Sequence, residues 1–350
     1  TWQDARGSLC EGNHGSLAEE IQQTCKVQAA SGYGMVTHIY NLRHDLIPDT
    51  AVSFCTIMDY FGMQLTGRKE ALVHTSNAAS FGFFDAQKNA FMTGKLAKMG
   101  VEEPWLPEVC TGIEALGSYR ERIVTVAIGD NQASFLGAAG SEKNTLLVNM
   151  GTGGQISVLS DQYFTAEGIE ARPFLQGAYL LAGSSLCGGK AYALLEKFFR
   201  EFMKAATGQE EPLYKTLEKL ARDGKASCVG KEEKQRLQIE TTFDGTRVHP
   251  EQSGSITNLC AENFTPAAFV YGTLEGMSRE LYQMYQTIQN GTGMKIKRMI
   301  GSGNGLRKNP VLCEIVEEMF GAKLVLAECE EEAATGAAVS SMQQQGGQIL

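Results

Sequence analysis

The chain has 350 residues, of which 43% are hydrophobic and 20% are charged, and its formal net charge is −9. This length and composition predict a globular protein of two domains or of one large α/β unit. Because the balance is acidic and the Lys and Arg residues are scattered, we expect neither nucleic acid nor an anionic membrane as a partner. No apolar run approaches the roughly 20 residues that a bilayer span needs.

The first 120 residues are expected to be mostly helical and irregular. Apolar residues recur at helical spacing over 16–29 and 35–47, which is typical of amphipathic helices. Residues 49–67 form an apolar run that we expect to be buried and closed by a turn. Residues 101–112 contain two prolines and no periodicity, which indicates a surface connection.

We place a domain boundary near residue 122, with 1–121 as the N-terminal domain and 122–350 as the C-terminal domain. In the second part, strands alternate with helices, a pattern that favours an α/β domain. The predicted strands are 122–129, 144–150, 155–161, 177–185, 295–303 and 322–328. The predicted helices are 188–206, 265–289, 309–321 and 331–345, and the charged segment 208–235 is expected to be an exposed helical excursion.

The nine cysteines and five histidines follow no recognised ligand or disulfide pattern. No two cysteines have CxxC spacing, and their odd number favours the reduced thiols of a cytoplasmic protein. Because the histidines show no HExxH or similar spacing, we expect no structural metal site.

Three glycine-rich turns are candidates for phosphate binding, since glycines let successive backbone N–H groups converge on one point. The first is the GTGG turn between two predicted strands, which an ordinary hairpin also explains. The second and third each lie between a strand and a helix, where an ordinary structural turn is the alternative. The small residues of 331–341, in the last predicted helix, are expected to allow tight helix–sheet packing. Leu306 breaks the dinucleotide fingerprint of the third turn, and Asn309 is by default the N-cap of the next helix. The residues concerned are Gly151, Thr152, Gly153 and Gly154, then Gly188 and Gly189, then Gly301, Gly303 and Asn309.

Two acidic residues are candidates for contact with a hydroxylated substrate. Asp130 stands where a strand pattern changes to a helical one, and a helix N-terminus favours the ionised carboxylate that accepts a hydroxyl proton. N-capping alone also explains Asp130. Trp2 and Asp4 can form a platform on which a sugar ring stacks and hydrogen-bonds, although an ordinary surface edge has the same appearance.

Taken together and in order, these motifs resemble those of the FGGY family of carbohydrate kinases, and the resemblance covers essentially the whole chain. The stretches TWQDAR, GDNQAS, CGGKAYALL and GSGNGLRKNPVL look most like the sedoheptulokinase branch of that family. The ordered motifs are WQDxR (2–6), SNAAS (76–80), GDNQA (129–133), GTGG (151–154), CGGK (187–190), FDGTRVHP (243–250), GSGNGLRKN (301–309) and EEAATGAA (331–338).

The resemblance implies two domains of the actin-like, RNase H-like ATPase fold, with sugar and ATP in the cleft between them. Two departures stand out. The family's first phosphate hairpin, D-x-G-T-x-S, would lie upstream of Thr1, so we expect a fragment or processed form whose first domain is incomplete. The FDGTRVHP stretch replaces the commoner G-E-R-x-P, so that its acidic residue is shifted or is lost at Thr246.

The resemblance also implies roles for individual residues. Asp130 would be the general base that deprotonates the terminal sugar hydroxyl, and Asn131, Trp2 and Asp4 would contact the sugar. Mg²⁺ would bridge the phosphates of ATP, with no protein ligand of the metal assigned. The expected nucleotide contacts are Gly151, Thr152 and Gly153 near the γ-phosphate, and Gly188, Gly189, Gly301, Gly303 and Asn309 near ADP.

The sequence therefore predicts ATP-dependent phosphorylation of a ketose at its terminal hydroxyl, above all of sedoheptulose to sedoheptulose 7-phosphate. The alternatives are another FGGY kinase of the xylulose or ribulose type, or a sugar- or nucleotide-binding fragment with impaired catalysis. An actin- or Hsp70-type ATPase is disfavoured because GDNQ and WQDxR have no role there. The expected partners are the small-molecule sugar and ATP, and a homodimer is left open.

Overall fold

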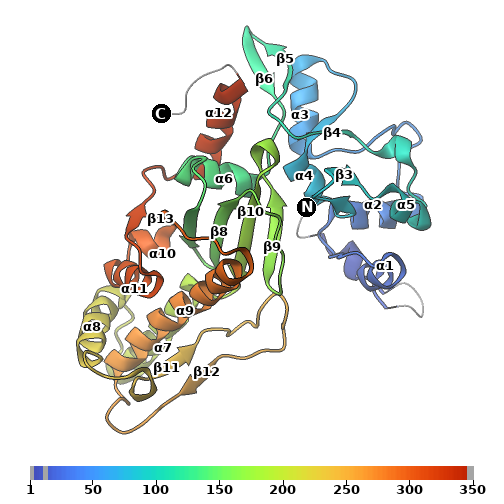
Figure 1. Ribbon diagram of the computed structural model, residues 1–350. Helices are drawn as coiled ribbons and strands as arrows, with labels where there is room; N and C mark the ends of the chain where they lie inside the picture. Colours follow the sequence, from blue (N-terminus) through green and yellow to red (C-terminus); the bar gives the residue numbers. More distant parts are fainter. Residues whose placement is uncertain (1–3, 11–14, 345–350) are drawn as a thin grey trace. The chain divides into compact units, whose positions relative to one another are not determined.

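The computed structural model describes residues 4–10 and 15–344, and the chain divides into two compact units (Figure 1). Unit 1 comprises residues 1–140, 172–179 and 331–350, and unit 2 comprises 141–171 and 180–330. By their contacts, residues 122–140 and the C-terminal helix therefore group with unit 1. The domain boundary near residue 122 stays a prediction. Within the described residues, no helix is both long and apolar enough to cross a membrane.

Unit 1 is built from short helices and two-stranded sheets. Its helices are α1 Leu17–Cys25, α2 Gly34–Arg43, α3 Ile57–Thr66, α4 Thr75–Ser80, α5 Thr93–Leu96, α6 Asp130–Ala139 and α12 Glu332–Gln344. Its strands are β1 Leu72–His74, β2 Phe84–Asp85, β3 Ala90–Phe91, β4 Glu108–Cys110, β5 Ala115–Tyr119 and β6 Arg122–Thr125. Strand β4 pairs in parallel with β1, whereas β2–β3 and β5–β6 are antiparallel pairs.

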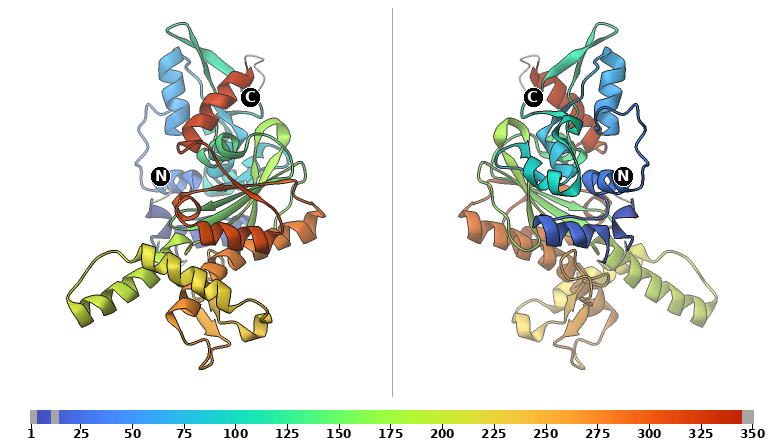
Figure 2. Two further views of the ribbon diagram at one scale, coloured as in Figure 1. Left: turned by 90° about the vertical axis from the view of Figure 1, so that its left-hand side faces the viewer. Right: turned by 90° about the vertical axis from the view of Figure 1, so that its right-hand side faces the viewer.

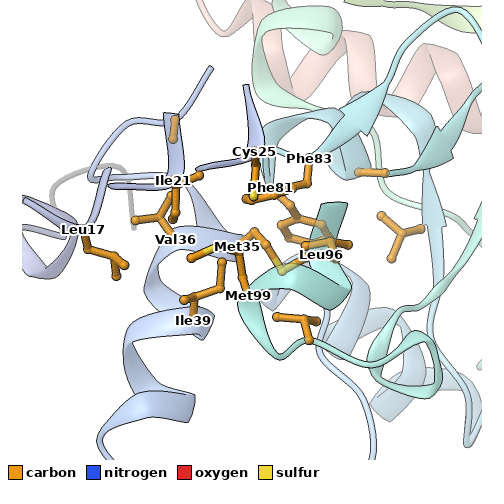
Figure 3. Packing of buried hydrophobic residues seen from close by; sticks show 14 of the residues in the cluster. Leu17, Ile21, Cys25, Met35, Val36, Ile39, Phe81, Phe83, Leu96 and Met99 are labelled. Carbon is orange, nitrogen blue, oxygen red and sulfur yellow. The ribbon is translucent and has the colours of Figure 1, made fainter. Parts of the chain in front are cut away.

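The two helices expected near the start of the chain are confirmed. Ser16 caps α1 in a capping box with Glu19, and the helix ends at Lys26, which takes the left-handed conformation. Apolar side chains from α1 and α2 then meet side chains from the segment after α4 and from α5 in one buried cluster (Figure 3). Its members include Leu17, Ile21, Met35, Ile39, Phe81, Phe83, Leu96 and Met99.

The apolar run 49–67 is not buried as expected. Its helix α3 exposes 77% of Ile57 and 63% of Phe61, while the fully covered side chain is the acidic Asp59. The main contacts of α3 are with the β5–β6 hairpin, and Met63 packs, partly buried, against the buried cluster of unit 1. Because a helix turns by about 100° per residue, the covered face holds Asp59 and Gly62 and leaves Ile57 and Phe61 outside.

Two further predictions for unit 1 need correction. The stretch 101–112 is more than a connection, since it contributes β4 to the parallel pair with β1. The strand predicted over 122–129 ends at Thr125, because β6 pairs only with the short β5.

Unit 2 is organised around a six-stranded mixed sheet with the order β14-β13-β7-β8-β10-β9. Strand β13 is parallel to both β14 and β7, and β7 forms an antiparallel hairpin with β8, which confirms the hairpin predicted at GTGG. The strands are β7 Thr145–Met150, β8 Gly154–Ser160, β9 Ile169–Pro173, β10 Tyr179–Ser185, β13 Arg298–Ser302 and β14 Leu324–Leu326, with a separate antiparallel pair β11 Gln238–Glu240 and β12 Ser255–Thr257. The last two residues of β9 and the first residue of β10 are grouped with unit 1.

The long helix α9 is the centre of the helical layer of unit 2 and contacts β8 and β11 as well as its neighbouring helices. As predicted, Thr265 caps it and Pro266 is its first residue. The charged excursion contains a helix, α8, which is not wholly exposed because Leu217, Ala221 and Gly224 are buried. Helix α7 extends away from the sheet (Figure 2). The helices are α7 Gly189–Thr207, α8 Tyr214–Ser227, α9 Pro266–Thr292, α10 Asn304–Arg307 and α11 Pro310–Phe320.

Two glycines bring α6 and α12 of unit 1 into backbone contact. A Cβ on Gly336 would overlap the carbonyl oxygen of Ala133, and a Cβ on Gly137 would overlap that of Glu332. The small residues of α12 thus allow tight packing, as expected, but against a helix rather than a sheet. Because α6 begins at Asp130, this contact helps to fix the helix that presents that residue.

Gly336→Ala should destabilise unit 1, because the added methyl group meets backbone that cannot rotate away. Overpacking of this kind costs about 1–3 kcal/mol, which denaturant unfolding measures. The matched control is Gly94→Ala in α5, where a Cβ meets nothing within 4 Å. An equal loss in both variants would contradict the α6–α12 contact.

Candidate active site

Asp130 is the first residue of α6, and the capping residue is Gly129 rather than Asp130. The Asp130 side chain is exposed, and its Oδ1 accepts the backbone N–H of Asn131 at 2.7 Å. A carboxylate in the first turn is favoured by the partial positive charge of the helix N-terminus. N-capping by Asp130, the alternative explanation of this residue, is therefore not observed, because Gly129 takes the capping position.

Asn131 follows on the same helix with one unused acceptor. Its Oδ1 is buried and has no hydrogen-bond partner within the described part of the chain. A buried polar atom without a partner is costly, on the order of 1–3 kcal/mol.

The approach of the chain to α6 is fixed by neighbouring polar side chains of unit 1. Asn77 on α4 donates Nδ2–H to the carbonyl of Ala127 at 3.1 Å. Gln132 on α6 donates its Nε2–H to the carbonyl of Pro173 at 2.8 Å. The contact of Asn77 gives the SNAAS motif a structural role that its sequence alone did not indicate.

Asp4 is held by Arg6, two residues away. Its carboxylate accepts the backbone N–H of Arg6 at 3.0 Å and the guanidinium Nε–H at 3.0 and 3.1 Å, while Arg6 Nη1 donates to Asn41 Oδ1 at 2.6 Å. These hydrogen bonds lower the pKa of Asp4 to about 2. Asp4 is thus ionised at neutral pH and can accept hydroxyl hydrogen bonds, and its partner Trp2 lies outside the described residues.

The first two glycine turns, both in unit 2, come together at one edge of the sheet. The backbone N–H groups of Gly189 and Lys190 donate to the carbonyls of Gly151 and Thr152, both at 2.9 Å. A Cβ on Gly153 would lie 2.6 Å from the carbonyl oxygen of Ser185. The N–H of Gly189 is therefore already bonded to the first turn. The absence of a side chain at Gly189 lets the two turns approach each other.

The third glycine turn reaches the same place from β13, the parallel neighbour of β7. Gly303 has a φ of +86°, and a Cβ there would lie 2.6 Å from the carbonyl oxygen of Met150, the last residue before GTGG. Asn149 also donates to Ser302 Oγ at 2.7 Å. The strand–turn–helix order predicted for this segment is confirmed, and the three turns are adjacent.

Two of the predicted nucleotide contacts have structural roles that are visible in unit 2. Asn309 is buried, and its Oδ1 accepts the N–H of Leu312 at 3.1 Å as the N-cap of α11. Gly301 lies within β13, where a Cβ would come within 3.1–3.2 Å of leucine side chains. Whether either also contacts a nucleotide stays a prediction.

Three charged residues that the sequence analysis did not select anchor the second turn. Lys190 Nζ pairs with Asp244 of the FDGTRVHP stretch at 2.7 Å. Below the turn, Ser185 Oγ donates to Glu280 Oε2 on α9 at 2.7 Å, and burial raises the pKa of Glu280. The CGGK and FDGTR motifs were both recognised, but nothing in their spacing shows that they pair.

A metal cage is not found among residues 4–10 and 15–344, where no group of three or more His, Cys, Asp or Glu is arranged to hold an ion. Mg²⁺ that is bound by phosphate oxygens and water needs few protein ligands. The donor set therefore suits an ion that arrives with a nucleotide better than a resident metal.

Residues 146–343, more than half of the chain, match the family described as the FGGY family of carbohydrate kinases, C-terminal domain. Over 364 aligned residues the chain is 26% identical to the sedoheptulokinase of Mus musculus, and the match covers 98% of this chain and 72% of that protein.

Solved sugar-kinase structures share the fold. The xylulose kinase from Rhodospirillum rubrum matches with a TM-score of 0.78 at 20% identity, covering 95% of this chain and 67% of that one. The Plasmodium falciparum glycerol kinase with ADP has a TM-score of 0.74 at 15% identity, with coverage of 95% and 67%. The predicted α/β class and two-domain actin-like ATPase fold are confirmed.

Arg6→Ala should raise the pKa of Asp4 from about 2 toward its ordinary value of 3.8, because the guanidinium hydrogen bonds are lost. Since the folded-state pKa is the lower one, the Asp4–Arg6 pair stabilises the fold above the ordinary pKa and loses this effect as the pH falls toward 2.

Carboxyl NMR titration of Asp4 measures this directly. Arg68→Ala is the control, since Arg68 pairs with Glu108 instead and should leave the pKa of Asp4 unchanged. An ordinary pKa in the unaltered chain would contradict the pairing.

Proposed function

The chain belongs to the FGGY family of carbohydrate kinases, and on this premise we propose that it transfers the γ-phosphoryl group of ATP to the terminal hydroxyl of a ketose. The observation that carries the proposal is the meeting of three glycine turns at the end of β7, where backbone approaches backbone without side chains between. Such turns suit phosphate groups, because N–H donors can converge there.

On the sugar side, Asp130 is the general base. Its exposed carboxylate accepts the proton of the attacking hydroxyl as the phosphoryl group is transferred. Asn131, the next residue on α6, is proposed to contact a second sugar hydroxyl, and the carboxylate of Asp4 accepts a third. Trp2 would supply the stacking face.

On the nucleotide side, Gly151, Thr152 and Gly153 contact the γ-phosphate. Gly188, Gly189, Gly301, Gly303 and Asn309 are proposed to lie near ADP. Mg²⁺ that accompanies ATP would supply the positive charge that neutralises the phosphates during transfer. No residue of the chain is assigned to the ion.

For the sugar itself we propose sedoheptulose, converted to sedoheptulose 7-phosphate. The support is the match to the mouse sedoheptulokinase along 98% of this chain. Xylulose is the second candidate, because the fold is also similar to the R. rubrum xylulose kinase. The nine unpaired thiols support a reducing, cytoplasmic compartment.

Release of ADP from ATP and Mg²⁺ in the presence of sedoheptulose, xylulose, ribulose or glycerol tests the function. We expect sugar-dependent release, with the highest kcat/KM for sedoheptulose. ATP hydrolysis that does not depend on sugar would indicate an ATPase. Nucleotide binding without phosphoryl transfer would indicate a nucleotide-binding protein without catalytic activity. Either result would contradict the kinase proposal.

Asp130→Asn should lower kcat by about 10²–10⁴-fold, the usual contribution of a general base, because the amide cannot accept the proton. Affinity for ADP should be unchanged by calorimetry, since Asp130 and the glycine turns belong to different units. Asp223→Asn, at an exposed position on α8, is the matched control. Full turnover of Asp130→Asn would exclude the assigned role.

A further inference from the structure

The backbone just before Asp130 is held by a polar contact from another part of unit 1. Gly129, the capping residue of α6, donates its N–H to Ser76 Oγ at 2.9 Å. Ser76 is buried near the start of α4, next to Asn77, which holds the carbonyl of Ala127. Two consecutive residues of α4 therefore hold both ends of the three-residue segment that leads into α6.

Ser76 is in turn held by His74, the last residue of β1, whose side chain is completely buried. The ring atom Nδ1 lies 2.7 Å from Ser76 Oγ and 3.2 Å from Ser76 N, and Nε2 lies 3.2 Å from the carbonyl oxygen of Thr111. Both ring nitrogens thus have partners inside the protein.

The chemistry of these partners fixes the direction of every hydrogen bond. The backbone N–H of Ser76 can only donate, so Nδ1 is the acceptor and carries no proton. The carbonyl of Thr111 can only accept, so Nε2 carries the proton. The N–H of Gly129 can only donate, so Ser76 Oγ accepts it and turns its own proton toward Nδ1.

Burial supports the same state of the ring. It lowers the pKa of His74 to about 4, against a smaller opposing effect of the carbonyl of Thr111. The imidazole is therefore neutral at physiological pH. Along this chain of hydrogen bonds each group donates to the next, from Gly129 to Ser76, from Ser76 to His74 and from His74 to Thr111.

We propose that His74 and Ser76 are positioning residues for the general base: His74 orients the Ser76 hydroxyl, and that hydroxyl fixes the entry of the chain into α6 and thereby the place of Asp130. Neither residue touches the substrate. The description of Asp130 as the base rests on the proposed function. The chain of hydrogen bonds from Gly129 through Ser76 and His74 to Thr111, here called the relay, does not.

The relay can be tested without activity by ¹⁵N NMR of the full chain. The His74 ring should show a protonated Nε2 and an unprotonated Nδ1. Ser76→Ala should speed hydrogen exchange at the amide of Gly129, whereas Ser80→Ala should not, because the Ser80 hydroxyl donates to the carbonyl of Asn77 on its own helix. The opposite tautomer, or unchanged exchange in Ser76→Ala, would overturn the proposal.

The effect on the base is read from turnover. Ser76→Ala should lower kcat by about 10–100-fold, the cost of a misplacement of about 1 Å, with the KM for ATP unchanged. Ser76→Thr, which keeps the hydroxyl, should recover most of kcat, and Ser80→Ala should match the unaltered chain.

Equal kcat in Ser76→Ala and the unaltered chain would overturn the proposal. A loss of kcat in Ser76→Ala that Ser76→Thr does not recover, together with a lower melting temperature, would also overturn it. That pattern would mean that Ser76 contributes only to packing. If the unaltered chain shows no sugar-dependent turnover, the kinase proposal fails, and the NMR result alone then decides the relay.

Discussion

Close contact between backbone segments is the constraint on which the rest of unit 2 depends. Parallel β13 and β7 end at the same edge of the sheet, and the hairpin to β8 starts there. The turns after these strands and after β10 touch through atoms of Gly153, Gly188 and Gly303, where a Cβ would collide with main chain. Any side chain at these positions would push the turns apart, so the sheet topology and the glycines together form the place at which we propose that phosphates bind.

In unit 1, helix α6 is held in place by hydrogen bonds as well as by close backbone contact. The residue that matters there is an exposed carboxylate, Asp130, which must be held in place without being neutralised. Helix α6 is fixed along its length by the glycine contact with α12 and at its start by Ser76 and Asn77. None of these contacts is made to the carboxylate itself, as the proposed role of Asp130 as the base requires.

Local features were predictable from the sequence, because neighbouring residues determine them. The β7–β8 hairpin at GTGG, the capped start of α9 and the strand–turn–helix order around Gly303 all follow from turn and cap chemistry. Contacts between distant segments were not predictable. Lys190 and Asp244 are 54 residues apart, and the burial of Asp59 in place of Ile57 depends on which face of α3 the β5–β6 hairpin covers.

Binding of ADP to the glycine turns is the central claim, and backbone amide NMR of the full chain tests it most directly. On addition of ADP with Mg²⁺, the largest shift changes should occur at Gly188, Gly189, Gly301, Gly303 and Asn309, and the same addition to Gly188→Ala should give weaker binding. Changes confined to other residues, or no change up to millimolar ADP, would contradict the account.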